Sequence, residues 1–267
     1  MKKFLLGCVG LAAMLAGPAM AADMRVPAPP PPVVYYDWTG AYVGGNIGGV
    51  WYDHHQHFTT PTAAPALFLP SASFGTSGSD AIFGFHAGAQ WQWGIWVLGV
   101  EAALSGCTHE CRSFSGVNTS PIFGPTQFAE HKMTNLFTAG PRLGLAFDRW
   151  MIFVTGGWAS ANLKSSFCSS ITGLCDGPGS NGNGASRNNN GYYVGGGFDY
   201  MVHKGALVDV LLGVEYQHYD VKGQRAFCGL PGCGAATSAD YDLSSKGDLV
   251  RARLTIKTQG YRWWGTY

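Results

Sequence analysis

From Trp38 onward, apolar and polar residues alternate along the chain with a period of two, and this pattern limits the fold more than any other feature. In the segment 81–93, Ala, Phe and Trp fill the odd positions, whereas Gly, His and Gln fill all even positions but one. Because successive side chains of a β-strand point to opposite faces, the pattern indicates strands. After the N-terminus, no apolar run approaches the roughly 20 residues that a spanning helix needs. The hydrophobic residues, 46% of the chain, must therefore be spread over strands.

Eight segments read as strands, and the connections between them alternate in length. The strands are expected at about 39–51, 81–93, 96–105, 134–147, 151–163, 192–200, 208–217 and 250–257, although the pattern does not show the two faces of 151–163. Short turns lie near 94–95, 148–150 and 203–206, and long connections rich in Gly, Ser, Asn and Thr lie near 52–80, 106–133, 164–190 and 221–248. This asymmetry is typical of a transmembrane barrel with periplasmic termini. We expect an all-β fold, an eight-stranded antiparallel up-and-down transmembrane barrel.

A soluble barrel would show the same alternation with its apolar face inside, so other features must decide between the two. The polar face is rich in glycine, which suits the narrow interior of an eight-stranded barrel. Aromatic residues gather at the short-turn end, as in a membrane-interface girdle. The polar face also carries four acids and four bases, which can neutralise one another inside: Glu101, Arg142, Asp199, Asp209, Glu215, Arg251, Arg253 and Lys257. We expect a charged plug, because so narrow a barrel has room for little beyond side chains.

Counting residues from the turns indicates which of these charges are neighbours. Glu101 and Arg142 fall at similar depth on adjacent strands. The same holds for Glu215 with Arg251 and for Asp209 with Lys257. Three cross-strand ion pairs are therefore expected.

The first 21 residues have the features of a secretory signal peptide: Lys2 and Lys3, an apolar stretch, and Ala-Met-Ala at 19–21. The mature chain should begin at Ala22-Asp23. Residues 22–37 are rich in proline and should form an extended periplasmic arm. Residues 38–267 are then the barrel with four extracellular loops.

Six cysteines remain after removal of the signal peptide, in three close pairs. An even number in an exported chain favours disulfides, and the spacing favours nearest neighbours: Cys107 with Cys111, Cys168 with Cys175, and Cys228 with Cys233. The alternative, a soft-metal site, needs reduced thiols, which the periplasm opposes.

Several motifs carry a resemblance to a known family. The segment 38–49, WTGAYVGGNIGG, resembles the opening of the porin-like outer-membrane β-barrel family of Gram-negative bacteria, which includes small surface antigens and haemin-binding barrels. The segments 146–150 (AFDRW), 194–197 (VGGG) and 214–216 (VEY) also fit this family. The resemblance covers the whole mature chain and implies an outer-membrane location. Thr258 departs from it, since an aromatic residue usually follows the equivalent of Lys257, and the tail 261–267 supplies a terminal aromatic instead.

Other functional classes find less support. His54, His55 and His57, in the first long connection, form a metal-like cluster, since imidazole suits zinc, copper or haem iron, but such a loop is more often merely polar. Our main expectation is therefore no cofactor. No Ser, His and acid set falls on one face, so we expect no enzyme. With a net charge of +1 and no basic stripe, we expect no nucleic-acid partner.

The sequence thus predicts a structural or surface role, with outer-membrane lipid and the barrel-assembly machinery as partners. Members of barrel families resembling this one can be joined to peptidoglycan through an N-terminal alanine. Ala22 would be the attachment residue and Asp23 a recognition residue. An arm of roughly fifteen residues would reach about 45 Å in polyproline II. The alternatives are a narrow porin-like channel and a haem- or metal-binding surface receptor.

Overall fold

The computed structural model describes residues 36–58, 73–114, 127–169, 175–176, 185–223, 225–227 and 240–259. The predicted signal peptide, most of the predicted arm with Ala22 and Asp23, Cys228, Cys233 and the aromatic tail lie outside these ranges. The compact unit that holds the barrel begins at Tyr36, two residues before the boundary expected from the sequence. Among the described residues, no helix is long and apolar enough to cross a membrane.

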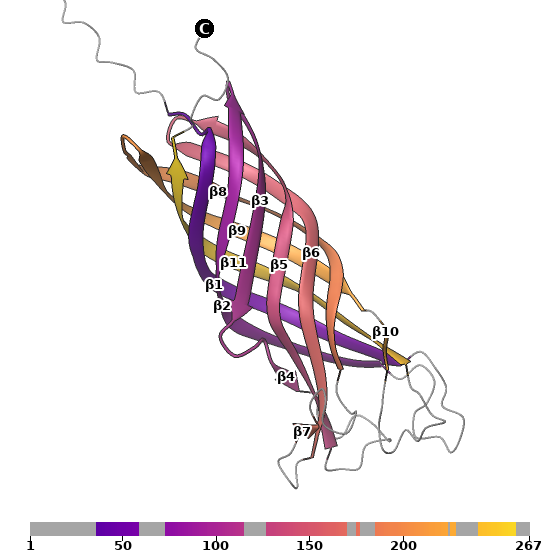
Figure 1. Cartoon of the computed structure of the whole chain (residues 1–267). Helices are drawn as coiled ribbons and strands as arrows, with labels where there is room; N and C mark the ends of the chain where they lie inside the picture. The colour runs from indigo at the N-terminus through magenta and orange to yellow at the C-terminus, as the bar shows by residue number, and fades with distance from the viewer. Residues whose placement is uncertain are drawn as a thin grey trace, which may run out of the picture. The chain divides into compact units, whose positions relative to one another are not determined.

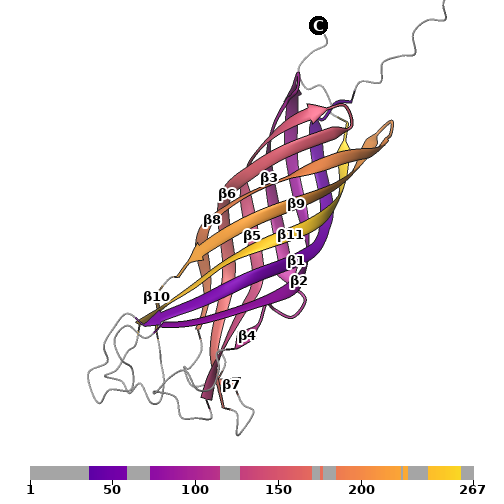
Figure 2. The same cartoon turned by 180° about the vertical axis from the view of Figure 1, so that it is seen from behind.

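Eight long strands close into a barrel (Figure 1). They are β1 (Gly40–Phe58), β2 (Ser73–Trp93), β3 (Trp96–Cys107), β5 (Gln127–Phe147), β6 (Trp150–Ser169), β8 (Ala185–Lys204), β9 (Val208–Lys222) and β11 (Asp240–Thr258). Each pairs antiparallel with the next, and β1 closes the barrel against β11, with Tyr42 opposite Lys257 (Figure 2). Short strands β4 (Ser113–Phe114), β7 (Cys175–Asp176) and β10 (Arg225–Phe227) add to β5, β6 and β11. The predicted fold class is confirmed.

The outer surface of the barrel is apolar over the segments where the sequence predicts strands. Large hydrophobic side chains are exposed there, among them Phe85 at 71% and Leu254 at 53%. The glycine-rich polar face points inward, with Gln90 and Gln217 buried. We call the apolar part of the outer surface the apolar band. The faces of β6 are also fixed, because Met151, Phe153 and Thr155 are buried, whereas the residues between them are exposed. An apolar exterior around a polar interior is the arrangement of a membrane barrel.

The strands continue well beyond the apolar band, into segments that the sequence analysis assigned to long connections. β2 begins at Ser73 instead of 81, β5 at Gln127 instead of 134, and β11 at Asp240 instead of 250. We call these segments the strand extensions. In them the polarity of the two surfaces is reversed, because apolar side chains such as Tyr52 and Leu243 are buried inside the barrel, while polar ones such as Lys246 are exposed outside. The prediction of the strand ends was therefore wrong, because it required apolar residues outside and polar residues inside.

A β-bulge adds to this difference in β5. The register against β6 shifts between Met133 and Leu136, and both of these side chains are buried although they differ in parity. The bulge formed by the two residues between them switches the inward-pointing side chains from odd to even positions, while the strand stays in the sheet.

Three layers fill the interior in order along the strands. Nearest the short turns is an apolar layer around Trp38, which includes Val97, Met151 and Met201. Charged residues follow, and the half toward the long connections holds a second apolar cluster, which includes Tyr193 and Leu249, together with buried polar side chains such as His54 and Gln56. The charged layer is the most unusual part of this interior, because buried charges require partners.

Candidate functional site

Six charged side chains from five strands converge inside the barrel. All are at most 7% exposed: Glu101 on β3, Arg142 on β5, Asp199 on β8, Glu215 on β9, and Arg251 and Arg253 on β11. We call them the lumen cluster. Three acids meet three guanidinium groups, so the cluster is neutral when all six are ionised.

Glu101 is at the centre of the lumen cluster. Its carboxylate accepts hydrogen bonds from Nη1 and Nη2 of Arg253 at 3.0 and 2.6 Å and from Nη1 of Arg142 at 3.1 Å. The Tyr42 hydroxyl donates a further hydrogen bond to Glu101, at 2.8 Å. Both oxygens of the carboxylate thus accept hydrogen bonds, from donors on three other strands.

The other two acids complete the network. Asp199 forms an ion pair with Nη2 of Arg142. Glu215 accepts from Nε of Arg251 at 3.1 Å, forms an ion pair with Arg253, and accepts from Gln217 at 2.6 Å. Charge-assisted hydrogen bonds of this kind offset the large cost of removing ions from water.

Small and aromatic neighbours make room for these charges. A Cβ on Gly213 would lie 1.9 Å from Oδ1 of Asp199, so the carboxylate occupies space that only glycine leaves. The Arg142 guanidinium carbon lies 3.6 Å from the centroid of the Phe153 ring, a close cation–π contact. Sequence reasoning missed Phe153, because the faces of its strand were undecided, and it missed Tyr42, which was noted only as part of a motif.

Asp209 and Lys257 form a separate ion pair nearer the short turns. Lys257 Nζ lies 2.9 Å from Oδ2 of Asp209 and also donates to the Thr39 carbonyl at 3.1 Å. The eight charges expected on one face therefore divide into a cluster of six and an isolated pair.

Trp38 fills the barrel at the short-turn end. It is fully buried, its indole Nε1 donates to the Asp148 carbonyl at 3.3 Å, and its own carbonyl accepts from Gln90 at 2.7 Å. Tyr36 precedes it and accepts a hydrogen bond from Arg149 at 2.6 Å. The chain that leads into the barrel is thus held against the β5–β6 turn at two successive points.

The three histidines considered as possible haem or metal ligands do not point to the same side of the barrel wall. They lie on β1 and not in a loop as predicted, and the strand sends His54 inward and His55 and His57 outward. His54 is buried, with Nδ1 3.0 Å from the Ser245 hydroxyl and Nε2 3.1 Å from the Cys111 carbonyl. Both of its ring nitrogens are therefore engaged within the protein.

Cys107 and Cys111 form a disulfide across a tight turn, with 5.4 Å between their Cα atoms. Asp80 fixes this turn, because its carboxylate accepts from the backbone N–H groups of His109 at 2.8 Å and Cys111 at 3.1 Å. The Asp80 carboxylate also lies within 4.8 Å of both sulfur atoms, but these are bonded to each other, which leaves neither as a thiolate ligand.

The same turn is joined to its neighbours by further contacts. The Tyr52 hydroxyl donates to the Arg112 carbonyl at 2.9 Å. A hydrogen bond from Lys132 lowers the pKa of the Glu110 carboxyl. We call residues 107–112 the disulfide strap. Of the other predicted pairs, Cys168 and Cys175 are opposite each other in the β6–β7 register, and Cys228 and Cys233 lie beyond the described ranges.

An apolar exterior, a closed ring of eight strands and a paired ionic interior together define a transmembrane β-barrel. The model of the outer membrane protein beta-barrel domain family matches residues 9–246, and the chain belongs to that family. The protein is accordingly an outer-membrane protein.

Curated relatives include the 31 kDa outer-membrane immunogenic proteins of Brucella melitensis and Brucella suis. Each is 33% identical over 164 residues, which is 59% of this chain and 65% of the relative. The match thus spans less than two thirds of these relatives' length.

Solved structures similar to this chain include two outer-membrane proteins. OprG of Pseudomonas aeruginosa is 12% identical, covering 83% of this chain and 96% of that one, with a TM-score of 0.40. The Escherichia coli protease OmpT is 8% identical, covering 84% and 99%, with a TM-score of 0.38.

Proposed function

We propose that this protein is a closed outer-membrane anchor with a structural and surface role, and not a diffusion channel or an enzyme. The observation that carries the proposal is the lumen cluster, in which each buried carboxylate is paired with a guanidinium group from another strand. A permeating ion would have to separate these pairs, and leaving one buried partner unpaired costs several kcal/mol. The apolar layers on both sides add a further barrier.

Conductance in planar bilayers tests this proposal. The unmutated protein, shown to be folded by its heat-dependent shift in gel mobility, should give little or no steady conductance. The alternative, a narrow porin-like channel, requires a stable conductance that rises with salt concentration. A large, long-lived conductance from the folded protein would overturn the closed barrel.

A second role, covalent attachment to the cell wall, is favoured by the contacts of Tyr36 and Trp38. We propose that the short-turn end is periplasmic and that residues 22–35 lead from it toward peptidoglycan. A pulling force on such an arm would act on the buried Trp38 side chain and on the three hydrogen bonds of Trp38, which involve its indole and its backbone N–H and carbonyl groups. The free α-amine of Ala22 would attack the acyl group that a transpeptidase carries. An amide forms, the enzyme's nucleophile leaves, and the amine loses a proton.

Isolated cell walls test the attachment separately. Sacculi boiled in detergent and digested with muramidase should release the protein with a muropeptide on Ala22. If all of the protein dissolves in detergent with an unmodified Ala22, the attachment is refuted, and the closed barrel is unaffected.

A further inference from the structure

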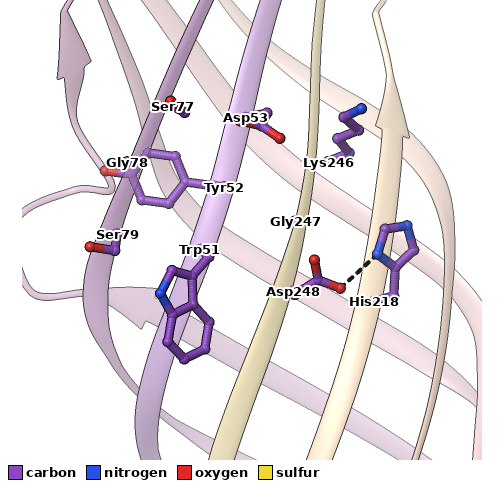
Figure 3. Close-up of a pocket in the computed structure, with 10 residues that line it drawn as sticks. All are labelled: Trp51, Tyr52, Asp53, Ser77, Gly78, Ser79, His218, Lys246, Gly247 and Asp248. Carbon is purple, nitrogen blue, oxygen red and sulfur yellow. Dashed lines mark hydrogen bonds and ion pairs between the residues drawn. The ribbon is translucent and has the colours of Figure 1, made fainter.

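A pocket of about 520 Å³ lies on the outer surface of the barrel, across β2, β1, β11 and β9 (Figure 3). Its side chains come mostly from the outward faces of these strands, among them Trp51, Asp53, Lys246, Asp248 and His218. An exterior hollow lined by charges is unexpected on a barrel whose exterior is otherwise apolar over the membrane.

The position of the pocket explains this composition. It lies where the apolar band ends and the reversed strand extensions begin. At the edge of the pocket next to the apolar band, Val250 and Tyr216 are exposed. At the opposite edge, next to the strand extensions, lie Asp53 and Lys246, which are opposite each other in register. Trp51 is 55% exposed. The tip of its indole ring lies beside Gly49, 3.8 Å from the point where a Cβ atom on that residue would be, so the side chain points back toward the apolar band. An exposed Trp at this level is typical of the zone of lipid headgroups.

The polar groups of the pocket are arranged to receive hydrogen bonds. Asp248 accepts from Nδ1 of His218 at 2.9 Å and from the Tyr216 hydroxyl at 2.5 Å. Asp53 supplies a second carboxylate, and Ser77 and Ser79 line the opposite side (Figure 3). A carboxylate can accept several hydrogen bonds at once, and a serine hydroxyl can both donate and accept.

This chemistry distinguishes between possible headgroups. A phospholipid phosphate would meet two carboxylates beside the one lysine, and like charges repel. A sugar offers many hydroxyl donors to those carboxylates and an apolar ring face to Trp51, and its oxygen atoms can accept hydrogen bonds from Lys246. Because the apolar band continues directly below, acyl chains attached to the sugar would lie against the barrel.

We propose that the pocket binds the saccharide headgroup of an outer-leaflet glycolipid, held by Trp51, Asp53, Lys246 and Asp248. The inference rests on the proposed orientation, in which the long connections are outside the cell. It does not depend on whether the barrel conducts ions.

Binding to lipid nanodiscs tests the proposal. The full mature protein is placed in phosphatidylcholine nanodiscs, and a fluorescently labelled diglucosyl diacylglycerol, a glycolipid without phosphate, is titrated in. Saturable binding is expected, weakened at least tenfold in Trp51→Leu and in Asp248→Asn. Trp158→Leu is the matched control, because Trp158 is also an outward-facing Trp, 49% exposed, but on β6 away from the pocket. It should bind as tightly as the unmutated protein.

Three other results would overturn the inference. One is equal binding by the unmutated protein, both pocket variants and the control. Another is equally tight competition by phosphatidylglycerol, which would indicate a general site for anionic lipids. The third is equally tight binding of the deacylated saccharide, which would indicate a soluble sugar ligand. A conducting barrel that still binds the glycolipid would refute only the closed-barrel proposal.

Discussion

Arg142 connects the two halves of the lumen cluster, because its guanidinium group reaches Glu101 from one side and Asp199 from the other. Its flat face rests on Phe153 at 3.6 Å, which leaves few orientations open to the side chain. A lysine could not replace it, since a single ammonium group lacks the fork that serves two carboxylates at once.

We expect Arg142→Met to destabilise the barrel by about 3–5 kcal/mol, because the variant leaves Asp199 charged and buried without its partner. Urea unfolding in lipid vesicles, followed by tryptophan fluorescence, measures the change. The double variant Arg142→Met/Asp199→Asn removes the stranded charge and should recover a large part of the loss. Unchanged stability in the single variant would show that the buried pair is not a structural requirement.

At this scale, the sequence indicates which charges lie inside and also the cross-strand pairs Glu101–Arg142, Glu215–Arg251 and Asp209–Lys257, which are in contact in the structure, but it does not indicate the rest of the network. Arg253 was not assigned a partner, yet it contacts both Glu101 and Glu215. Its reach depends on the length of the arginine side chain and on the tilt of β11, and neither can be read from alternation alone.

The strand extensions show why the element boundaries could not be predicted. Alternation continues through them, but the apolar side chains move from the lipid face to the interior once the exterior meets water. A rule based on an apolar exterior ends each strand at this reversal. In β5 the bulge near 134–135 adds a change of parity that no periodic pattern predicts.

The boundary of the apolar band can be tested with one charge placed at two levels. Arg at Leu254, which is 53% exposed on β11, should cost about 2–4 kcal/mol near the bilayer midplane. Leu98→Arg and Val210→Arg should act in the same direction. Asn190→Arg is the matched control, because Asn190 also faces outward but belongs to an extension. Equal losses at Leu254 and Asn190 in bilayer folding assays would contradict the assigned boundary.

The disulfide strap is the element for which the sequence was most informative, since a separation of only four residues in an exported chain favoured the pair. Its fixation by Asp80 was not foreseen, because that residue was assigned to a loop. Closing so short a ring contributes about 2 kcal/mol in the chain-entropy model. Cys107→Ser/Cys111→Ser should therefore be cut faster by proteases between residues 107 and 112.

Peptide mapping without reductant provides the independent check of the strap. A 107–111 cross-link is expected in the unmutated protein. Free thiols at these positions, or a link to another connection, would disprove the pairing.

The molecule as a whole is stabilised by an interior whose layers differ in chemistry. The apolar layer at the short-turn end depends on a residue that precedes the first strand, since Trp38 is fully buried there. The sequence placed this residue in a family motif, but the motif gave no indication that it fills the barrel.

Trp38→Ala should cost about 3–5 kcal/mol, the usual loss for removing a buried Trp side chain. Tyr36→Ala is the control, because its side chain lies nearer the surface and should cost about 1 kcal/mol through its hydrogen bond and cation–π contacts. The temperature of the gel-mobility shift gives the comparison. Similar shifts for the two variants would mean that Trp38 does not stabilise the barrel by filling its interior.

The reversed strand extensions also determine how far the protein projects from the lipid. Seven residues of β1 follow Trp51. At about 3.3 Å per residue and a tilt near 40°, they raise the end of the strand by roughly 18 Å. In the proposed orientation this height is comparable to a layer of surface sugars, so antibodies and other large molecules would reach the connecting loops before any lower part of the barrel. Sequence change driven by such encounters should then concentrate in the loops, while the extensions act as a rigid stalk that packing holds constant.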